Sequence, residues 1–497
     1  MRPGPRVLFV TSEMAPWQKT GGLGDISAAL PIALKQAGAD VRVLIPAYPA
    51  LHKAFPKARV VARIPPPGGL LPASRILQAE TREGMPLLLL DCPTFFDRPG
   101  NPYQTQGRDW PDNAQRFALL ARIAALLAST DSPIAWRPHI LHCNDWQSGL
   151  APAYLHYVHA GGAATVMTIH NIAFQGLFPE NTLSELGLPR KAFVYDGVEF
   201  YGQISFLKAG LQFANKITTV SPTYAGEIQR PDLGFGLDGL LRYRKADLEG
   251  ILNGVDALWN PATDAYLAKH YDAHHLAAKA ENRRALAAEL GLESDPAAPL
   301  LAIVSRLTHQ KGMDLVLACA DELLTEGEVL TQLVVLGNGE RSFEQGFRAL
   351  AARHPGRVAA LIGFDERAAH RIEAGADIFL MPSRFEPCGL NQLYSLRYGT
   401  PPVVRATGGL ADTVVDCTQQ TLSAGTANGF VFASADAGSL LTATRRAIEA
   451  WHNRRLWRQL QKTGMSADFS WPKAAAQYLA VYDAAINASG FSPTTAD

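Results

Sequence analysis

One pattern occurs twice along this chain of 497 residues: short, wholly apolar runs alternate with longer stretches of helical periodicity. Runs that are apolar throughout are typical of parallel strands buried on both faces, and their alternation with helices predicts doubly wound sheets. We therefore expect an α/β protein with two Rossmann-like domains. The expected strands are Arg6–Glu13, Ala39–Ala47, Pro86–Pro93, Pro138–Asn144, Ala164–His170 and Lys216–Ser221 in the first half, and Pro299–Leu307, Gln332–Gly337, Val358–Gly363, Asp377–Pro382, Pro401–Ala406 and Gly429–Ala433 in the second.

Turn-forming pairs mark the boundary between the two series. Asn253-Gly254 and Asn260-Pro261 lie between the last run of the first half and the first run of the second. We therefore predict an N-terminal domain over residues 1–250 and a C-terminal domain over residues 251–470.

Charge and cysteine usage exclude several classes of protein. Lys and Arg number 46, as do Asp and Glu, so the formal net charge is zero and nucleic acid is not expected as the main partner. Five cysteines without a CxxC pair favour reduced thiols in a cytoplasmic protein. The apolar run Val7–Val10 is too short for a signal peptide, and no run is long enough to span a membrane, so no membrane partner is expected. His139 and His142 lack further ligands at metal-binding spacing, and we expect no metal.

A glycine-rich loop follows the first expected strand. It reads Lys19-Thr20-Gly21-Gly22-Leu23-Gly24-Asp25 and leads into a helix expected to begin near Ile26. Glycines at a helix N-terminus expose backbone N–H groups to an anion, and Lys19 adds a cation beside them. The loop is neither a Walker A nor a GxGxxG motif. Without the lysine, a tight strand-to-helix turn would explain the glycines equally well.

Candidate phosphate- and sugar-binding residues lie at or after the ends of three strands of the second half. Arg306 lies at the end of the expected strand Pro299–Leu307 and Lys311 follows it, and two fixed cations at this spacing can converge on a diphosphate. Glu386 lies after the strand ending at Pro382, and Thr407-Gly408-Gly409 opens a helix expected to begin near Ala411. The alternatives are solvated loop charges and a carboxylate that merely stabilises a helix N-terminus.

Two polar residues of the first half follow strands in the same way. Asp145 comes after the fourth expected strand and His170 ends the fifth, so both can face a polar sugar. Taken alone, His170 is better explained as a buried histidine with satisfied hydrogen bonds. The sequence has no GxSxG motif and no carboxylate pair at glycosidase spacing. Cations, glycine loops and one acid suit a diphosphate leaving group that is stabilised without a metal.

These motifs, in this order, resemble the bacterial glycogen synthases, retaining glucosyltransferases related to plant starch synthases. The resemblance covers nearly the whole chain. The matching stretches are the Lys19–Asp25 loop, Asp97–Tyr103, His142–Gln147, Ile169–Asn171, Ile251–Asp256, Trp259–Asp264, the loop of Arg306 and Lys311, Arg384–Leu390 and Thr407–Leu410. Many related transferases carry a second glutamate eight positions after the first, whereas Tyr394 stands there in this sequence, as in the glycogen synthase pattern.

The resemblance implies a GT-B type fold, in which two Rossmann-like domains face each other across a cleft. It implies ADP-glucose as donor, bound mainly by the C-terminal domain, and an α-1,4-glucan such as glycogen as acceptor, bound mainly by the N-terminal domain. No metal or other cofactor is implied. The last helix, about residues 471–497, is expected to pack back on the first domain.

The resemblance also implies a role for each matching residue. Arg306 and Lys311 would neutralise the leaving diphosphate, and Glu386 would lie near the donor glucose. Asp145, His170 and Asn253 would orient sugars, and Phe364 is a candidate for stacking on the base. The remaining substrate-binding candidates are Lys19, Gly21, Gly22, Asp25, Tyr103, Asn171, Cys388, Gly389, Leu390, Thr407, Gly408 and Gly409.

Three other functions remain open at this stage. One is an enzyme of the same fold that transfers another sugar or uses UDP-glucose. Another is a bilobal sugar-binding protein, which would share the two domains, and the third is a phosphorylase, which would need a pyridoxal phosphate lysine. Retention ordinarily suggests a covalent intermediate, but the sequence offers no convincing nucleophile. We therefore expect same-face attack assisted by the departing phosphate.

Overall fold

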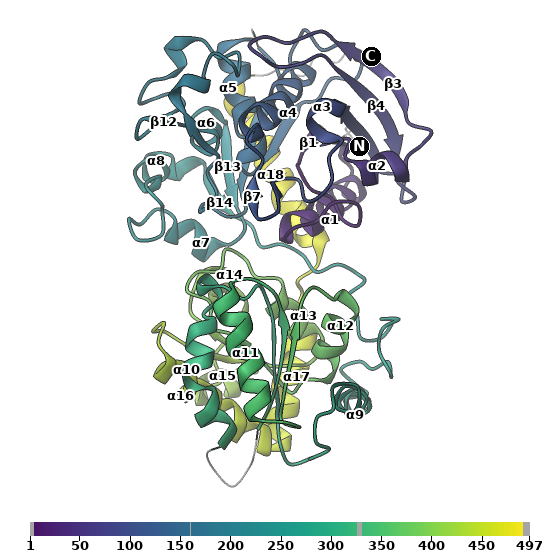
Figure 1. Ribbon diagram of the computed structural model, residues 1–497, viewed down its shortest axis with the longest axis vertical. Helices are drawn as coiled ribbons and strands as arrows, with labels where there is room; N and C mark the ends of the chain where they lie inside the picture. Colours follow the sequence, from purple (N-terminus) through teal and green to yellow (C-terminus); the bar gives the residue numbers. More distant parts are fainter. Residues whose placement is uncertain (1–3, 160, 326–330, 491–497) are drawn as a thin grey trace. The chain divides into compact units, whose positions relative to one another are not determined.

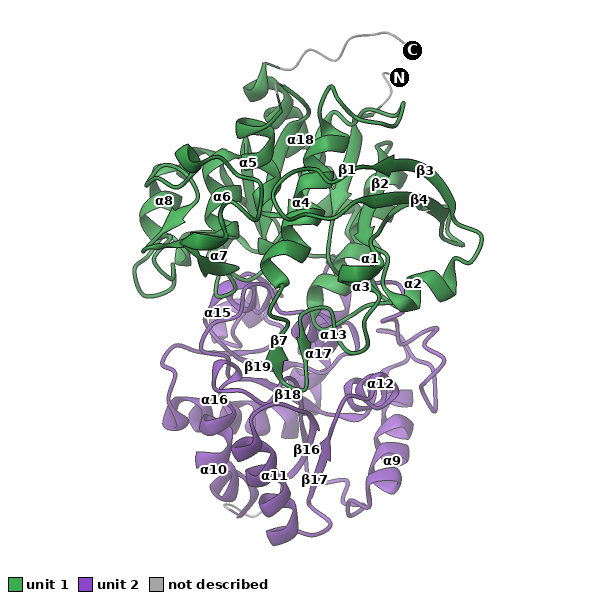
Figure 2. Ribbon diagram, turned by 45° about the horizontal axis from the view of Figure 1, so that its top comes forward, with its two compact units in different colours: residues 1–254, 470–497 green, residues 255–469 purple. Residues whose placement is uncertain are grey.

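The computed structural model describes residues 4–159, 161–325 and 331–490, and it divides into two compact units (Figure 2). Unit 1 comprises Met1–Gly254 and Ser470–Asp497, and unit 2 comprises Val255–Phe469. The chain therefore passes between the units twice, at residues 254–255 and 469–470. The sequence analysis placed these two points at 250–251 and 470–471.

Unit 1 is built on a nine-stranded sheet in the order β14-β13-β9-β8-β1-β2-β5-β4-β3. Neighbours from β14 to β5 pair in parallel, and β4 runs antiparallel to both β5 and β3. The strands are β1 (Arg6–Val10), β2 (Asp40–Pro46), β3 (Arg59–Ile64), β4 (Ser74–Glu80), β5 (Pro86–Asp91), β8 (Ile140–Asn144), β9 (Ala164–Ile169), β13 (Lys216–Thr219) and β14 (Leu248–Gly250).

All six strands expected in the first half are present in this sheet, each shorter at one or both ends than the apolar run. The strands β3 and β4 and the short edge strand β14 were not expected. Within β3 only Ala62 and Ile64 are buried, so its sequence lacks the continuous apolar run that marks the central strands. A strand at the edge of a sheet buries one face at most, so the hydrophobic pattern of its sequence is correspondingly weak.

Helices cover both faces of this sheet. Helix α18 (Trp471–Ser489) packs on α1 and against β8, β9 and β13, while α4 packs on α5 and contacts β1, β2 and β8. Figure 1 shows α18, the yellow helix, among the purple and blue elements of unit 1. The helices of unit 1 also include α1 (Gly22–Gln36), α2 (Pro49–Ala54), α3 (Pro93–Phe96), α4 (Asn113–Ala128), α5 (Leu150–Tyr157), α6 (Phe206–Phe213), α7 (Pro222–Glu227) and α8 (Asp238–Tyr243).

Short strands complete unit 1. β6 (Gln104–Thr105) pairs with β7 (Arg108–Asp109) in an antiparallel ribbon. A second small sheet contains β10 (Leu177–Pro179), β12 (Gln203–Ser205) and β11 (Glu199–Phe200), in that order.

Unit 2 is built on a parallel six-stranded sheet in the order β17-β16-β15-β18-β19-β20. All six strands expected in the second half are present: β15 (Leu300–Val304), β16 (Gln332–Gly337), β17 (Val358–Ile362), β18 (Ile378–Met381), β19 (Pro402–Arg405) and β20 (Phe430–Phe432). The helices are α9 (Lys279–Leu290), α10 (Met313–Thr325), α11 (Arg341–Arg353), α12 (Glu366–Gly375), α13 (Asn391–Arg397), α14 (Gly408–Thr413), α15 (Gln419–Ser423), α16 (Ala437–His452) and α17 (Arg454–Ser466).

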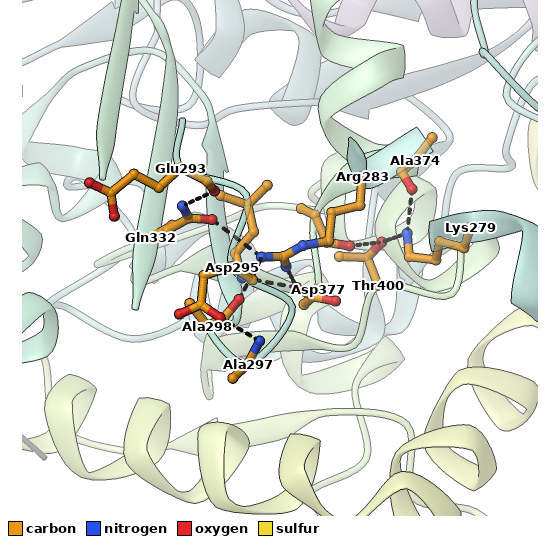
Figure 3. Close-up of polar contacts among 12 residues, drawn as sticks. Lys279, Arg283, Glu293, Asp295, Ala297, Ala298, Gln332, Ala374, Asp377 and Thr400 are labelled. Atoms are coloured by element: carbon orange, nitrogen blue, oxygen red, sulfur yellow. Dashed lines mark hydrogen bonds and ion pairs between the residues drawn. The ribbon is translucent and has the colours of Figure 1, made fainter. Parts of the chain in front are cut away.

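Two cations of α9, the buried Lys279 and the partly buried Arg283, anchor this helix to the end of α12 and to the segments just before β18 and β19 (Figure 3). The Nζ of Lys279 donates to the Thr400 hydroxyl at 2.7 Å and to the carbonyl oxygens of Ala374 and Glu373 at 2.9 and 3.0 Å. The guanidinium of Arg283 pairs with Asp377, the residue just before β18. Burial lowers the pKa of Lys279 to about 7 and that of Arg283 to about 10, so these contacts offset a substantial desolvation cost.

The strand order creates one switch point in each unit. In unit 1 the chain builds outward from β1 through β2, then returns to place β8 on the other side of β1. In unit 2 it builds from β15 through β16 and returns to place β18 beside β15. Open α/β sheets bind ligands beyond the carboxyl ends of the strands at such points. The loops after β1, β8, β15 and β18 are therefore the places to look for a site.

Candidate active site

The glycine-rich loop of unit 1 forms the first turn of α1. The helix begins at Gly22 with Gly21 as its N-cap, four residues before the expected start near Ile26. The expectation was wrong because glycines were read as a loop, whereas Gly22 and Gly24 lie inside the helix. The first-turn amides, which point along the helix axis, thus belong to the glycine loop itself.

A buried carboxylate that the sequence analysis did not select holds this loop. Glu13, which is 3% exposed, accepts hydrogen bonds from the Thr20 amide and hydroxyl, both at 2.6 Å, and from the Gly21 amide at 3.4 Å. It also accepts a bond from the Tyr103 hydroxyl at 2.6 Å. A glutamate at the end of an apolar run was the signal that could have identified it.

Lys19 and Asp25, the two charged residues of this loop, form an ion pair, and Tyr103 bonds to the glutamate that holds the loop. Lys19 and Asp25 form an ion pair at 2.8 Å, and both side chains are about one-third exposed. Burial raises the pKa of Tyr103 well above its ordinary value, and the charge of Glu13 raises it further. Tyr103 therefore stays a neutral hydrogen-bonding group that links Glu13 to the Ser12 hydroxyl, 2.8 Å away.

The ends of β8 and β9 bring Asp145, His170 and Asn171 together. One Asp145 oxygen accepts the His170 amide at 2.7 Å and the Asn171 amide at 3.4 Å. Asp145 has φ of 54°, a strained conformation for a residue with a side chain. Desolvation raises its pKa to about 7, and the charge of Glu13 contributes to this rise. The loops after β1 and β8 therefore lie close enough to interact electrostatically.

His170 is a buried neutral imidazole. Burial lowers its pKa to about 3, and its Nε2 lies 2.9 Å from the Asn144 side-chain oxygen. Its Nδ1 has no hydrogen-bond partner among the described residues, so the interpretation as a fully satisfied buried histidine is wrong for this nitrogen. Asn253, three residues after β14, is also buried, and its side-chain oxygen has no hydrogen bond within the described part of the chain.

In unit 2, Lys311 and Glu386 form a close ion pair. The Lys311 Nζ lies 2.5 Å from a Glu386 oxygen, and the Ser383 hydroxyl donates to the same oxygen at 2.9 Å. Glu386 is 5% exposed. Arg306 lies in the same loop as Lys311, and its guanidinium contacts the Gln310 side chain at 3.3 Å. Ser383 was not selected from the sequence.

Two glycines let the Glu386 loop lie directly on the N-terminus of α14. Gly408 has φ of 43°, and a Cβ there would lie 1.9 Å from the Glu386 carbonyl oxygen. A Cβ on Gly409 would lie 2.0 Å from the Cys388 carbonyl oxygen. The helix begins at Gly408 with Thr407 as N-cap, three residues before the expected start near Ala411. As in α1, the glycines that we had interpreted as a loop make up the first turn of the helix.

The residues after Glu386 lead into α13. Cys388 is buried, and the Gln392 side-chain amide donates to the carbonyl oxygens of Cys388 and Gly389, at 2.9 and 3.0 Å. Leu390 is the N-cap residue of α13. These bonds fix the backbone that follows Glu386.

Phe364 lies apart from this cluster. It is 76% exposed and follows β17, the edge strand, which β16 separates from β15. At about 4.8 Å per strand, its strand is roughly 10 Å from the one that precedes Arg306. A ligand that contacts both residues must be extended along the sheet edge.

Each unit thus presents groups suited to different chemistry. Unit 2 gathers cations, an acid and helix N-terminal amides, which can hold a diphosphate. Unit 1 gathers hydrogen-bonding groups suited to sugar hydroxyls, such as Asp145 and His170, and places them in the same unit as Lys19 and the first-turn amides of α1. Within residues 4–159, 161–325 and 331–490, no three His, Cys, Asp or Glu side chains form a metal-binding group. Both His142 nitrogens are engaged, with Tyr482 at 2.8 Å and Thr168 at 2.6 Å.

Family models match both halves of the chain. Residues 6–243 match the starch synthase catalytic domain, and residues 290–463 match the glycosyl transferases group 1 domain. No helix in the described part of the chain has the length and apolar character to cross a membrane.

Similar proteins align over almost the whole chain. A glycogen synthase of Dechloromonas aromatica is 59% identical, with 97% of this chain and 98% of the relative covered, and one of Nitrosomonas eutropha is 53% identical, with 97% and 96% covered. A solved catalytic domain of starch synthase IV from Arabidopsis thaliana, bound to ADP and acarbose, superposes with a TM-score of 0.86 at 32% identity. The superposition covers 97% of this chain and all of that one.

Proposed function

The chain belongs to the glycogen synthase family of GT-B glycosyltransferases, and on that premise we propose that it transfers glucose from ADP-glucose to the non-reducing end of an α-1,4-glucan, with retention of configuration, in glycogen biosynthesis. The observation that carries the proposal is the Lys311–Glu386 pair beside the N-terminus of α14. It provides a cation for a leaving phosphate and an acid for a sugar within one loop cluster.

The donor is held mainly by unit 2. Arg306 and Lys311 neutralise the diphosphate, and the first-turn amides of α14, with Thr407, bind phosphate oxygens. Glu386 fixes donor hydroxyls or stabilises positive charge at the anomeric carbon. Phe364 stacks on the base. The ADP found in the starch synthase IV structure supports an adenine nucleotide as the leaving group.

Unit 1 binds the acceptor and completes the donor site. Lys19 and the glycine-loop amides contact the donor when the domains close, and the Glu13 and Tyr103 bonds hold that loop in place. Asp145 and neutral His170 orient sugar hydroxyls, and the remaining candidates that help them are Asp25, Asn171 and Asn253. The acarbose in the same starch synthase structure supports a saccharide site.

The reaction that these groups support is same-face displacement. The glucan 4-hydroxyl oxygen forms a bond to the anomeric carbon as the bond from that carbon to the phosphate oxygen breaks. The hydroxyl proton passes to the departing phosphate oxygen, and ADP leaves. The cations of unit 2 supply the charge stabilisation, so the proposal needs no metal or other cofactor. We place the enzyme in the cytoplasm, which the five free cysteines support.

Labelled glucose tests the proposal directly. We expect the enzyme to incorporate label from ADP-glucose into glycogen, and to do so faster than from UDP-glucose. Faster incorporation from UDP-glucose would contradict the donor assignment, and glucan binding without consumption of either donor would contradict the activity. A glucosyl group trapped on a carboxylate would replace same-face displacement with a covalent mechanism.

A further inference from the structure

Arg384 belongs to the loop that carries Glu386 and joins it to the loop that carries Lys311. Its guanidinium makes two parallel bonds to the Asp314 carboxylate, both at 2.7 Å, and a third bond to the His309 carbonyl oxygen at 2.8 Å. Its backbone amide donates to the Gln310 carbonyl oxygen at 2.8 Å. Arg384 therefore contacts three residues of the Lys311 loop and the following helix while it sits two positions before Glu386.

The geometry of this pair restricts both loops. Asp314 is the second residue of α10, one turn after Lys311, so the bidentate contact fixes the direction in which α10 leaves the Lys311 loop. A guanidinium fork on a carboxylate is directional, unlike the point charge of a lysine. The hydrogen bond from Arg384 lowers the pKa of Asp314, which keeps the carboxylate ionised at neutral pH.

The Glu386 loop is supported from its other side as well. Arg405, at the end of β19, donates to the carbonyl oxygens of Ser383 and Arg384. The backbone that carries Arg384 is therefore fixed to β19, and the Arg384 side chain extends this support to the Lys311 loop.

The direct Lys311–Glu386 contact cannot fix the spacing of the two loops during turnover. When a donor diphosphate draws Lys311 toward it, that ion pair weakens, and the spacing of the loops must depend on other contacts. The Arg384–Asp314 pair involves neither Lys311 nor Glu386, so donor binding does not draw on its hydrogen bonds.

We propose that Arg384 is a positioning residue for the transfer reaction: its bidentate pair with Asp314 holds Lys311 and Glu386 at the spacing that lets both face one hexosyl diphosphate. The inference rests on the proposed function and adds two residues to it. Neither Arg384 nor Asp314 touches the substrate.

A double-mutant cycle tests this role with Arg384→Gln, Asp314→Asn and the double variant. We expect each single variant to lower kcat with ADP-glucose by tenfold to a hundredfold, because small misplacements of reacting groups have effects of this size. The double variant should lose no more than the worse single variant, since both changes break the same pair. The KM for glucan should stay within twofold of wild type.

A matched control lies on the same helix. Asp321 of α10 pairs with Arg353 of α11 at 2.9 Å, and both side chains are more than half exposed. Arg353→Gln and Asp321→Asn each break an Arg–Asp pair of unit 2 that lies farther along α10 than Asp314. Both variants should keep wild-type kcat. Arg384→Lys keeps the charge without the fork, so it should fold normally and still lose at least tenfold in kcat.

The outcomes separate this inference from the proposed function. If the wild-type enzyme does not consume ADP-glucose, the proposed function fails. If it does consume ADP-glucose, either of two results overturns the positioning role alone. One is a kcat of Arg384→Lys within twofold of wild type. The other is a loss in the double variant that equals the product of the losses in Arg384→Gln and Asp314→Asn. Far-UV circular dichroism and thermal unfolding of each variant show whether a loss of kcat accompanies a loss of folded protein.

Discussion

Two carboxylates of the candidate site differ in the groups that hold them. Glu386 faces an ammonium group and a hydroxyl, whereas Asp145 faces backbone amides and no cation that the structure records as its ion-pair partner among the described residues. A cation stabilises a buried carboxylate far more than amides alone. The Lys311 ammonium and the Ser383 hydroxyl thus hold the Glu386 carboxylate in place, whereas burial raises the pKa of Asp145 to about 7.

Lys311→Ala removes the cation of this pair. We expect kcat with ADP-glucose to fall by about 10² to 10³, the range found when one charge-stabilising donor is deleted from an active site. The loss leaves Glu386 buried without its cation, so the free energy of unfolding should also fall. Adding Glu386→Gln to the same chain should restore stability and leave kcat low. Near-normal turnover of Lys311→Ala would contradict the phosphate role.

Asp145→Asn should change the pH dependence of stability. Because the folded pKa is raised from 3.8 to about 7, the folded state binds more protons than the unfolded state between these values, and wild-type stability falls as pH rises through them. The asparagine variant lacks this loss. Its free energy of unfolding relative to wild type should therefore rise by about 2 to 4 kcal/mol from pH 4 to pH 7 and then level off. Urea unfolding of both proteins at each pH measures this, and a constant difference would contradict the raised pKa.

At the scale of elements, α1 and α14, the two candidates for phosphate-binding helices, begin with the same sequence feature. Both α1 and α14 begin within a Gly-Gly pair. In α14 the missing side chains let the Glu386 loop cross the first turn at a distance that a Cβ would forbid. The acid and the amides are thus brought together by backbone contact rather than by side-chain packing.

Gly409→Ala tests this contact. A Cβ at 2.0 Å from the Cys388 carbonyl oxygen forces the loop away from α14, so we expect lower thermal stability and a loss of donor turnover. Gly438→Ala is the matched control, because Gly438 is also the second residue of its helix, α16, and its nearest neighbour would lie 3.4 Å from the new Cβ. The control should be neutral or slightly stabilising. Equal behaviour of the two variants would contradict a close-approach role for Gly409.

At the scale of the whole molecule, the two passages of the chain between units are tied to each other. Val255 donates to the Phe469 carbonyl oxygen at 2.8 Å on the unit 2 side, and Gly254 packs against the Trp471 ring on the unit 1 side. The proposed function predicts that the two units close about this pair of connections.

Closure should be visible in solution scattering. We expect the radius of gyration to decrease when ADP and a maltooligosaccharide are both present, because Lys19 of unit 1 must approach a diphosphate held by unit 2. The oligosaccharide alone serves as the control and should change the curve less. Superimposable curves in all conditions would remove the support for closure.

Much of this site could be predicted because its residues follow apolar strands. Arg306, Lys311 and Glu386 were found by asking which polar residues come directly after such strands. Glu13 and Ser383 were missed, since each acts through hydrogen bonds to residues of the motifs, such as Tyr103 and Glu386, and neither belongs to a matching stretch itself. The starts of α1 and α14 were missed because glycine was read as a signal of loops, a tendency that tertiary contact overrides here.

The amino-acid sequence by itself determined twelve strands of the two main sheets, the two-unit organisation and the family, since buried parallel strands need continuous apolar runs and the motifs follow them in order. Only the tertiary structure decided which strand ends are neighbours, and so which polar groups meet. Strand order places β18 beside β15 and β8 beside β1, and no local pattern encodes that order, because it arises from the packing of helices and crossovers across the whole sheet.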